Sequence, residues 1–136
     1  MTDVLINLHY INMILVLATS TITGIWGLIL YFRSKRKTIE RIAQSWKIAL
    51  IVTAIVGLLQ GLLGVGLVLM GLKPGGGTGL YYLHYVYGAI VVFSIPVAYT
   101  YIGKDRRRAI LILSIAALVI AAAGARGMMT GLGIGG

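Results

Sequence analysis

Hydrophobic residues in this chain form four long stretches, which polar or glycine-rich segments separate. The stretches cover approximately residues 4–32, 48–72, 80–102 and 109–134, and only the last contains a charged side chain, Arg126. A helix needs about 20 apolar residues to cross roughly 30 Å of hydrocarbon. Backbone groups in lipid must be hydrogen-bonded within their own segment, so each stretch is expected to be an α-helix. The pattern therefore predicts an all-α integral membrane four-helix bundle, with residues 1–136 as a single transmembrane domain.

Composition supports this class and excludes several cofactors. Hydrophobic residues make up 59% of the 136 residues and charged residues only 11%. A water-soluble domain of this length exposes too much of its surface to hide so many apolar side chains. The chain contains no cysteine. This absence excludes a disulfide, a thiolate metal site, an iron–sulfur cluster and a covalently attached c-type haem.

The formal charge of +9 is concentrated between the hydrophobic stretches, which argues for a lipid bilayer as the partner and against a nucleic acid. Ten of the twelve basic residues lie in two segments: Arg33, Lys35, Arg36, Lys37, Arg41 and Lys47, and then Lys104, Arg106, Arg107 and Arg108. Basic loops remain on the cytoplasmic side of a membrane. Both termini and the loop that contains Lys73 are therefore expected on the outer side.

The segment from Arg33 to Trp46 is the one long polar stretch. Ile39, Ile42, Ala43 and Trp46 recur within it at helical spacing. The segment could therefore extend the second helix or lie along the inner surface. We favour a solvated basic loop that sets the topology.

The chain also reads as two tandem helical hairpins. Leu8-His9-Tyr10 opens the first and Leu83-His84-Tyr85 opens the second, and these are the only two histidines. A repeat with the same topology in both halves relates them by an axis along the membrane normal. Spans one and three are then parallel, and they lie on a diagonal if consecutive helices are neighbours. His9 and His84 are expected at the same depth near the outer face, across the bundle axis.

An imidazole near the membrane interface can simply reach water, but two at equivalent positions suggest a shared ligand. Haem iron takes two axial histidines, and helix bundles build cofactor sites from facing helices. His9 and His84 are thus candidate metal ligands. Glycines collect at the same depth, where they either allow close helix packing or line a flat ligand. The candidate cofactor-binding glycines are Gly61, Gly64, Gly88, Gly127 and Gly131.

Three further polar residues belong to the candidate site. Arg126 lies in the outer half of the fourth span, where it either extends to the headgroups or pairs with a haem propionate. Asn12 and Gln60 either join helices or support the histidines by hydrogen bonds. Met128 and Met129 leave histidine–methionine ligation as a less favoured arrangement.

These features resemble small four-span membrane b-type cytochromes of bacteria. The resemblance rests on His9 and His84, on the "LLQGLLG" run around Gln60 and on "ARGMMTG" around Arg126, and it covers most of the chain. It implies one haem b and electron exchange with a quinone or a redox partner, in the inner (plasma) membrane of a bacterium or archaeon. It also implies an electron carrier rather than an enzyme by itself. Better-known dihaem membrane cytochromes have two histidine pairs, whereas this chain has one.

The alternative function is that of a non-catalytic subunit in an oligomer or in a larger respiratory or photosynthetic complex, where a histidine could bind a chlorophyll magnesium. A coupled transporter is disfavoured because all three acids (Asp3, Glu40 and Asp105) lie outside the spans. A hydrolytic enzyme is excluded, since the spans contain no carboxylate pair and no nucleophile with its base.

Overall fold

The structure is a computed structural model that describes residues 2–33 and 39–134, with residues 39–42 described by their backbone alone. It contains the helices α1 (Thr2–Arg33), α2 (Ile39–Leu69), α3 (Tyr82–Thr100) and α4 (Arg106–Gly131), together with a short 3-10 turn, η1 (Pro74–Gly77). All four α-helices are long and apolar enough to cross a membrane. The shortest, α3, has 19 residues and is about 28 Å long, close to the thickness of the hydrocarbon core.

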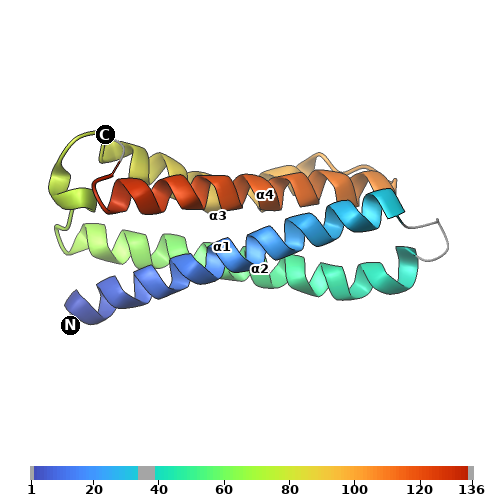
Figure 1. The fold of residues 1–136 in the computed structure, drawn as a ribbon, viewed down its shortest axis with the longest axis horizontal. Coiled ribbons are helices and arrows are strands. Elements are labelled where there is room, and N and C mark those ends of the chain that lie inside the picture. The colour runs from blue at the N-terminus through green and yellow to red at the C-terminus, as the bar shows by residue number, and fades with distance from the viewer. Residues whose placement is uncertain (1, 34–38, 135–136) are drawn as a thin grey trace.

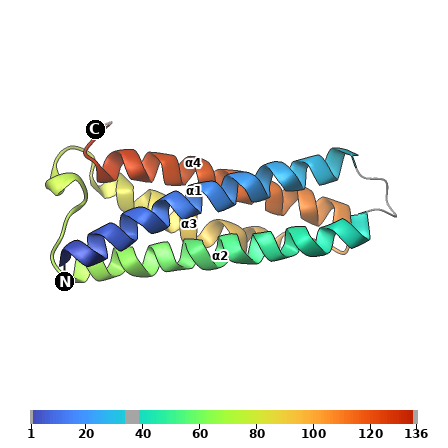
Figure 2. The ribbon, with the colours of Figure 1, turned by 60° about the horizontal axis from the view of Figure 1, so that its bottom comes forward.

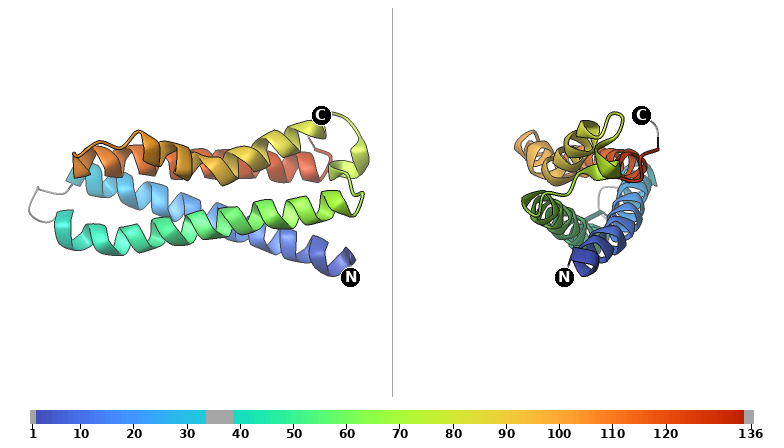
Figure 3. Two further views of the ribbon diagram at one scale, coloured as in Figure 1. Left: turned by 180° about the vertical axis from the view of Figure 1, so that it is seen from behind. Right: turned by 90° about the vertical axis from the view of Figure 1, so that its left-hand side faces the viewer.

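The helices form an elongated bundle in which neighbours in sequence are neighbours in space (Figure 1). Helix α4 packs along both α1 and α3, and α2 packs along α1 and less extensively along α3. Helices α1 and α3 therefore occupy one diagonal, as the end-on view in Figure 3 shows. Both termini and η1 lie at one end of the bundle (Figure 2). The prediction of an all-α four-helix bundle is confirmed.

We divide the bundle into two halves. The histidine half comprises residues 2–19, 58–90 and 121–134, and the basic half comprises residues 20–33, 39–57 and 91–120. The chain turns sharply in the histidine half, where Gly75 and Gly76 of η1 have φ values of 55° and 68° that side chains rarely tolerate. In the basic half, Asp105 caps α4 because its carboxylate accepts a hydrogen bond from the Arg107 backbone N–H at 3.0 Å.

The prediction of a solvated loop from Arg33 to Trp46 is wrong over its second part. Helix α2 already begins at Ile39, nine residues before the apolar run, because charged residues continue a helix outside hydrocarbon. Trp46 is only 3% exposed and its indole N–H donates to the Thr23 carbonyl oxygen at 2.9 Å. The helical spacing of Trp46 with the preceding apolar positions was therefore the better guide.

The other helix boundaries lie closer to the predicted ones. Helix α4 begins at Arg106, three residues before the predicted start, and ends at Gly131 instead of residue 134. Helix α3 is shorter than the predicted 80–102, but it continues past Pro96 as expected. Several residues discussed above lie outside the described part of the chain: Lys35, Arg36, Lys37 and the side chains of Ile39, Glu40, Arg41 and Ile42.

The packing is that of a protein surrounded by lipid. Large apolar side chains cover the outside of all four helices, for example Ile22 at 61%, Leu62 at 62% and Phe93 at 59% exposure. A patch of this extent on a soluble monomer would be unusual. The interior mixes apolar side chains with hydroxyls, and the Thr23 and Thr53 hydroxyls hydrogen-bond each other at 2.9 Å. Within the described residues, every buried side-chain nitrogen or oxygen atom has a hydrogen-bond partner.

Glycines allow α1 to approach its neighbours in the basic half. A Cβ added at Gly24 would lie 2.6 Å from a Leu118 side-chain carbon. A Cβ at Gly27 would overlap the Ser114 hydroxyl and lie 2.7 Å from the Trp46 indole nitrogen. Contacts this short are not found for real side chains, so glycine is required for the packing of this half.

Candidate functional site

The two histidines meet inside the histidine half. His9 lies near the start of α1 and His84 lies near the start of α3, on the bundle diagonal. Their ring centroids are 6.0 Å apart and the ring planes are inclined at 49°. Both side chains are partly buried. Two residues separated by 75 positions in the sequence are thus brought within reach of one shared ligand.

A backbone carbonyl group of α4 orients the His84 ring. The ring atom Nδ1 lies 2.8 Å from the Gly127 carbonyl oxygen. A carbonyl oxygen only accepts hydrogen bonds, so Nδ1 must carry the proton and donate it. In the neutral ring Nε2 is then unprotonated and keeps its lone pair. Metal-binding histidines commonly donate their second ring N–H to a backbone carbonyl in this way.

A chain of three polar side chains orients His9. The Asn12 amide nitrogen donates to the Val56 carbonyl oxygen at 3.0 Å and to the Gln60 side-chain oxygen at 2.9 Å. The Gln60 amide nitrogen lies 3.3 Å from Nδ1 and 3.2 Å from Nε2 of His9. The sequence proposed Asn12 and Gln60 as hydrogen-bond partners of the histidines, and the structure brings both into one network with His9.

The bond from Asn12 to the Val56 carbonyl determines which group donates and which accepts in the rest of this network. The Val56 carbonyl can only accept, so the Asn12 amide must present its NH₂ group on that side. That NH₂ group also faces Gln60, so Gln60 offers its oxygen to Asn12 and its own NH₂ group to His9. His9 therefore accepts a hydrogen bond through its unprotonated ring nitrogen. In this arrangement the lone pair of His9 is shared with Gln60, whereas Nε2 of His84 keeps its lone pair.

Two glycines lie directly against the imidazoles. A Cβ at Gly64 of α2 would lie 3.4 Å from Cε1 of His9. A Cβ at Gly131 of α4 would lie 3.0 Å from Cε1 of His84 and 3.2 Å from its Nδ1. Each ring thus lies against a glycine of the adjacent helix. A Cβ would press on His84 at Gly131 but would only touch His9 at Gly64.

The other three candidate glycines differ from these two. A Cβ at Gly61 would meet a Val92 methyl group at 2.5 Å, and one at Gly127 would meet Cβ of Tyr87 at 3.4 Å. These positions serve helix packing. At Gly88, one turn after His84, a Cβ would have no neighbour within 4 Å. Close packing and open space are therefore both represented among the predicted glycines, at different positions.

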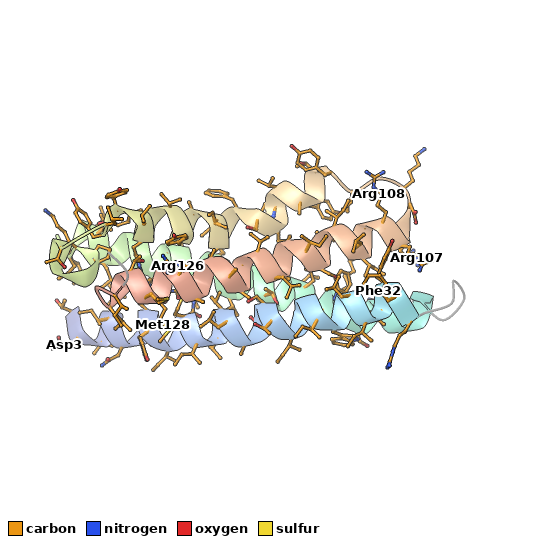
Figure 4. All side chains as sticks on the ribbon, turned by 45° about the horizontal axis from the view of Figure 1, so that its top comes forward. Asp3, Phe32, Arg107, Arg108, Arg126 and Met128 are labelled. Atoms are coloured by element: carbon orange, nitrogen blue, oxygen red, sulfur yellow. The ribbon has the colours of Figure 1, made fainter. Side chains whose placement is uncertain are left out.

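Arg126 does not lie between the helices. Its side chain is exposed on α4 (Figure 4). Its guanidinium lies 3.8 Å from the Met129 sulfur. The structure therefore does not bring Arg126 to the imidazoles. Met128, one turn from Gly124 on the same helix, packs against the apolar core.

Sequence reasoning missed the backbone partners of the site. The carbonyl groups of Val56 and Gly127 fix the two histidine networks, and a backbone acceptor has no sequence signature. Thr130 was also missed: its hydroxyl donates to the Gly127 oxygen at 3.0 Å and lies 3.5 Å from Nδ1 of His84. Its position three residues after Gly127, on the same face of α4, was the available signal.

The donor set limits what the site can hold. Within the described residues there is no group of three or more histidine, cysteine or acidic side chains that could bind a metal ion. A metal bound here would have two protein ligands, and its remaining coordination positions would need another ligand.

We compared the chain with known proteins. No family model, curated protein or solved structure matches it. The function must therefore be argued from the site itself.

Proposed function

We propose that this protein is a membrane b-type cytochrome that binds one haem b between α1 and α3, with His9 and His84 as the axial ligands. The observation that carries the proposal is the 6.0 Å separation of the two ring centroids across the bundle diagonal. Two imidazoles that bind one metal from opposite sides, through metal–nitrogen bonds of about 2 Å, place their centroids roughly 6 Å apart.

The surrounding residues fit this ligand in three respects. His84 is held by the Gly127 carbonyl with its Nε2 unprotonated, which is the form that binds iron. Gly64 and Gly131 leave room for the rings, and Gly88 leaves open space one turn after His84. When bound, haem supplies one-electron redox chemistry, and the chain contributes ligation, burial and local polarity.

Ligation requires one change at His9. The lone pair that would bind iron is the one that accepts a hydrogen bond from Gln60. Binding therefore breaks the hydrogen bond from Gln60 to the ring, which costs about 1 kcal/mol. Gln60 in this account holds His9 neutral and in place before the cofactor arrives.

We further propose that the histidine half faces outward and that the two hairpins are a parallel internal repeat. The support is that Lys104, Arg107 and Arg108 lie at the opposite end of the bundle, as the positive-inside rule requires. A quinone or a redox partner would then exchange electrons on the outer side. A cavity of about 230 Å³ opens there between Tyr81 and Thr130, and the Thr130 hydroxyl lies 3.5 Å from His84.

Optical spectroscopy tests the proposal. Protein produced with a haem supply and purified in mild detergent is expected to show a Soret band and a sharp reduced α-band. His9→Ala and His84→Ala should each abolish the six-coordinate low-spin spectrum. Tyr10→Phe, next to His9 and exposed, is the matched control and should leave the spectrum unchanged. A colourless wild-type preparation would refute the proposed function.

A further inference from the structure

A second candidate site lies at the other end of the bundle, far along the helices from the histidines. A recessed, open cavity of about 540 Å³ is formed there where the end of α1 meets the start of α4. It is lined by Tyr31, Asp105, Arg107, Arg108 and Leu111. Figure 4 shows Arg107, Arg108 and Phe32 together at this end. Two guanidinium groups thus line one cavity at the boundary of the apolar spans.

Arg107 is held at the cavity by α1. One of its terminal nitrogens donates to the Tyr31 carbonyl oxygen at 3.0 Å, and its guanidinium carbon lies 4.9 Å above the Tyr31 ring. These contacts restrict the side chain while using one of the five N–H donors of a guanidinium. The group is therefore pre-positioned and can still donate to a ligand.

The charge around the cavity is strongly positive. Arg33 at the end of α1 and Lys104 before α4 lie at the same end as the two lining arginines, and the N-terminus of α4 adds a partial positive charge. Asp105 is the one acid among the lining residues, and its carboxylate accepts the hydrogen bond that caps α4. The balance favours an anionic ligand.

We propose that this cavity binds the phosphate headgroup of an anionic phospholipid, with Arg107 and Arg108 as the phosphate ligands. Arginine binds phosphate oxygens in a bidentate manner, and basic pockets between membrane helices bind such headgroups. The cavity is open on one side, so a headgroup can enter it while the rest of the lipid stays outside. Apolar neighbours for the acyl chains lie alongside: Leu111 lines the cavity and Phe32 is 72% exposed.

Binding can be measured on the haem-free protein, so the result does not depend on the proposed cytochrome function. The probes are phosphatidylglycerol, phosphatidylcholine and inorganic phosphate, added to the detergent-purified chain and followed by native mass spectrometry and thermal unfolding. Phosphatidylglycerol is expected to be retained and to raise the Tm, whereas phosphatidylcholine is not. Equal binding of both lipids would overturn the proposal. If inorganic phosphate binds as tightly as phosphatidylglycerol, the cavity binds free phosphate instead of a lipid headgroup, and the proposal is overturned.

Three variants locate the site. Arg108→Gln removes a phosphate ligand while leaving the contact between Arg107 and Tyr31 intact, and it should weaken phosphatidylglycerol binding at least fivefold. Arg107→Gln with Arg108→Gln should weaken it further. Arg126→Gln makes the same change in charge on the exposed surface of the histidine half and should leave binding unchanged. An equal loss in Arg126→Gln would show that net charge alone attracts the lipid and would contradict the assigned site.

Discussion

The two halves of this bundle differ in how closely their helices pack around glycine. In the basic half, a Cβ at Gly24 or Gly27 would come within 2.7 Å of a neighbouring side chain, so these glycines are fixed by packing. In the histidine half, Gly61 is fixed in the same way, but a Cβ at Gly64 would make only an ordinary van der Waals contact with His9, and one at Gly88 would have open space. The histidine half thus keeps spare volume one turn after His84, whereas the basic half has none around Gly24 and Gly27.

The polar side chains of the two halves differ in chemical type. In the basic half, the Thr53 hydroxyl lies 2.9 Å from a carbonyl oxygen of its own helix and 2.9 Å from the Thr23 hydroxyl of α1. In the histidine half, amide and imidazole groups of Asn12, Gln60 and His84 make the bonds across helices. Imidazole nitrogens bind metals such as iron. The comparison supports the proposal that the histidine half is the site and the basic half its scaffold.

Overfilling the scaffold should have the largest effect. Gly27→Leu would force a side chain into the space of Ser114 and Trp46 and should destabilise the bundle by about 3 kcal/mol, the upper range for overpacked cores. Circular dichroism during thermal unfolding in detergent measures the loss. Gly103→Leu, where a Cβ has no neighbour within 4 Å, is the control. Equal stability of the two variants would contradict the role assigned to Gly27.

Removing Gln60 should lower the stability of the haem-free protein but raise its affinity for haem. Gln60→Leu is expected to destabilise the haem-free protein by about 1 kcal/mol, because Asn12 and His9 each lose a partner. Haem should then bind about fivefold more tightly, since binding no longer breaks a hydrogen bond. Gln44→Leu, on the exposed face of α2, provides the comparison in a haem titration. Weaker binding in Gln60→Leu would show that Gln60 supports the ligated histidine instead.

Loss of the Trp46 hydrogen bond should affect the scaffold alone. Trp46→Phe removes the donor to the Thr23 carbonyl and should cost about 1 kcal/mol. Because Trp46 lies in the basic half, the optical spectrum of the haem-loaded protein should not change. Trp26→Phe, at a half-buried position, controls for the loss of an indole. A shifted Soret band in Trp46→Phe would mean that the two halves are not independent.

Filling the space at Gly88 should change stability least. Gly88→Val is expected to alter the free energy of unfolding by no more than about 0.5 kcal/mol, since a Cβ at this position meets no neighbour within 4 Å. Haem occupancy should nevertheless fall, because the space lies one turn from His84. Absorbance of the purified protein per chain gives the occupancy, with Gly103→Val as the control. Full occupancy in Gly88→Val would exclude this space from the cofactor site.

The sequence predicted the features that depend on hydropathy, such as the four apolar helices. It did not predict which face of each helix is buried. The four spans follow from apolar runs that only lipid can accommodate. The start of α2 was misplaced because hydropathy marks where lipid begins, whereas the helix continues to Ile39. The sequence also predicted that His9 and His84 face each other, because both lie near the starts of helices on one diagonal of the bundle.

For Arg126, only the depth of the side chain in the membrane could be inferred from the sequence. Its level in the span was inferred from the rise per residue, but the buried face of α4 runs through Ile120, Gly127 and Thr130. One residue corresponds to 100° around a helix, so Arg126 falls outside that face. A sequence gives this direction only when the buried face of the helix is already known.

The most direct test of the central claim is a titration of haem into the haem-free protein, followed by electron paramagnetic resonance of the oxidised form. The account predicts saturation at one haem per chain with a low-spin signal of two axial imidazoles. In His9→Ala and His84→Ala that signal should be replaced by a high-spin one. A low-spin signal that survives the loss of either histidine, or the absence of saturable binding in the wild type, would contradict the account.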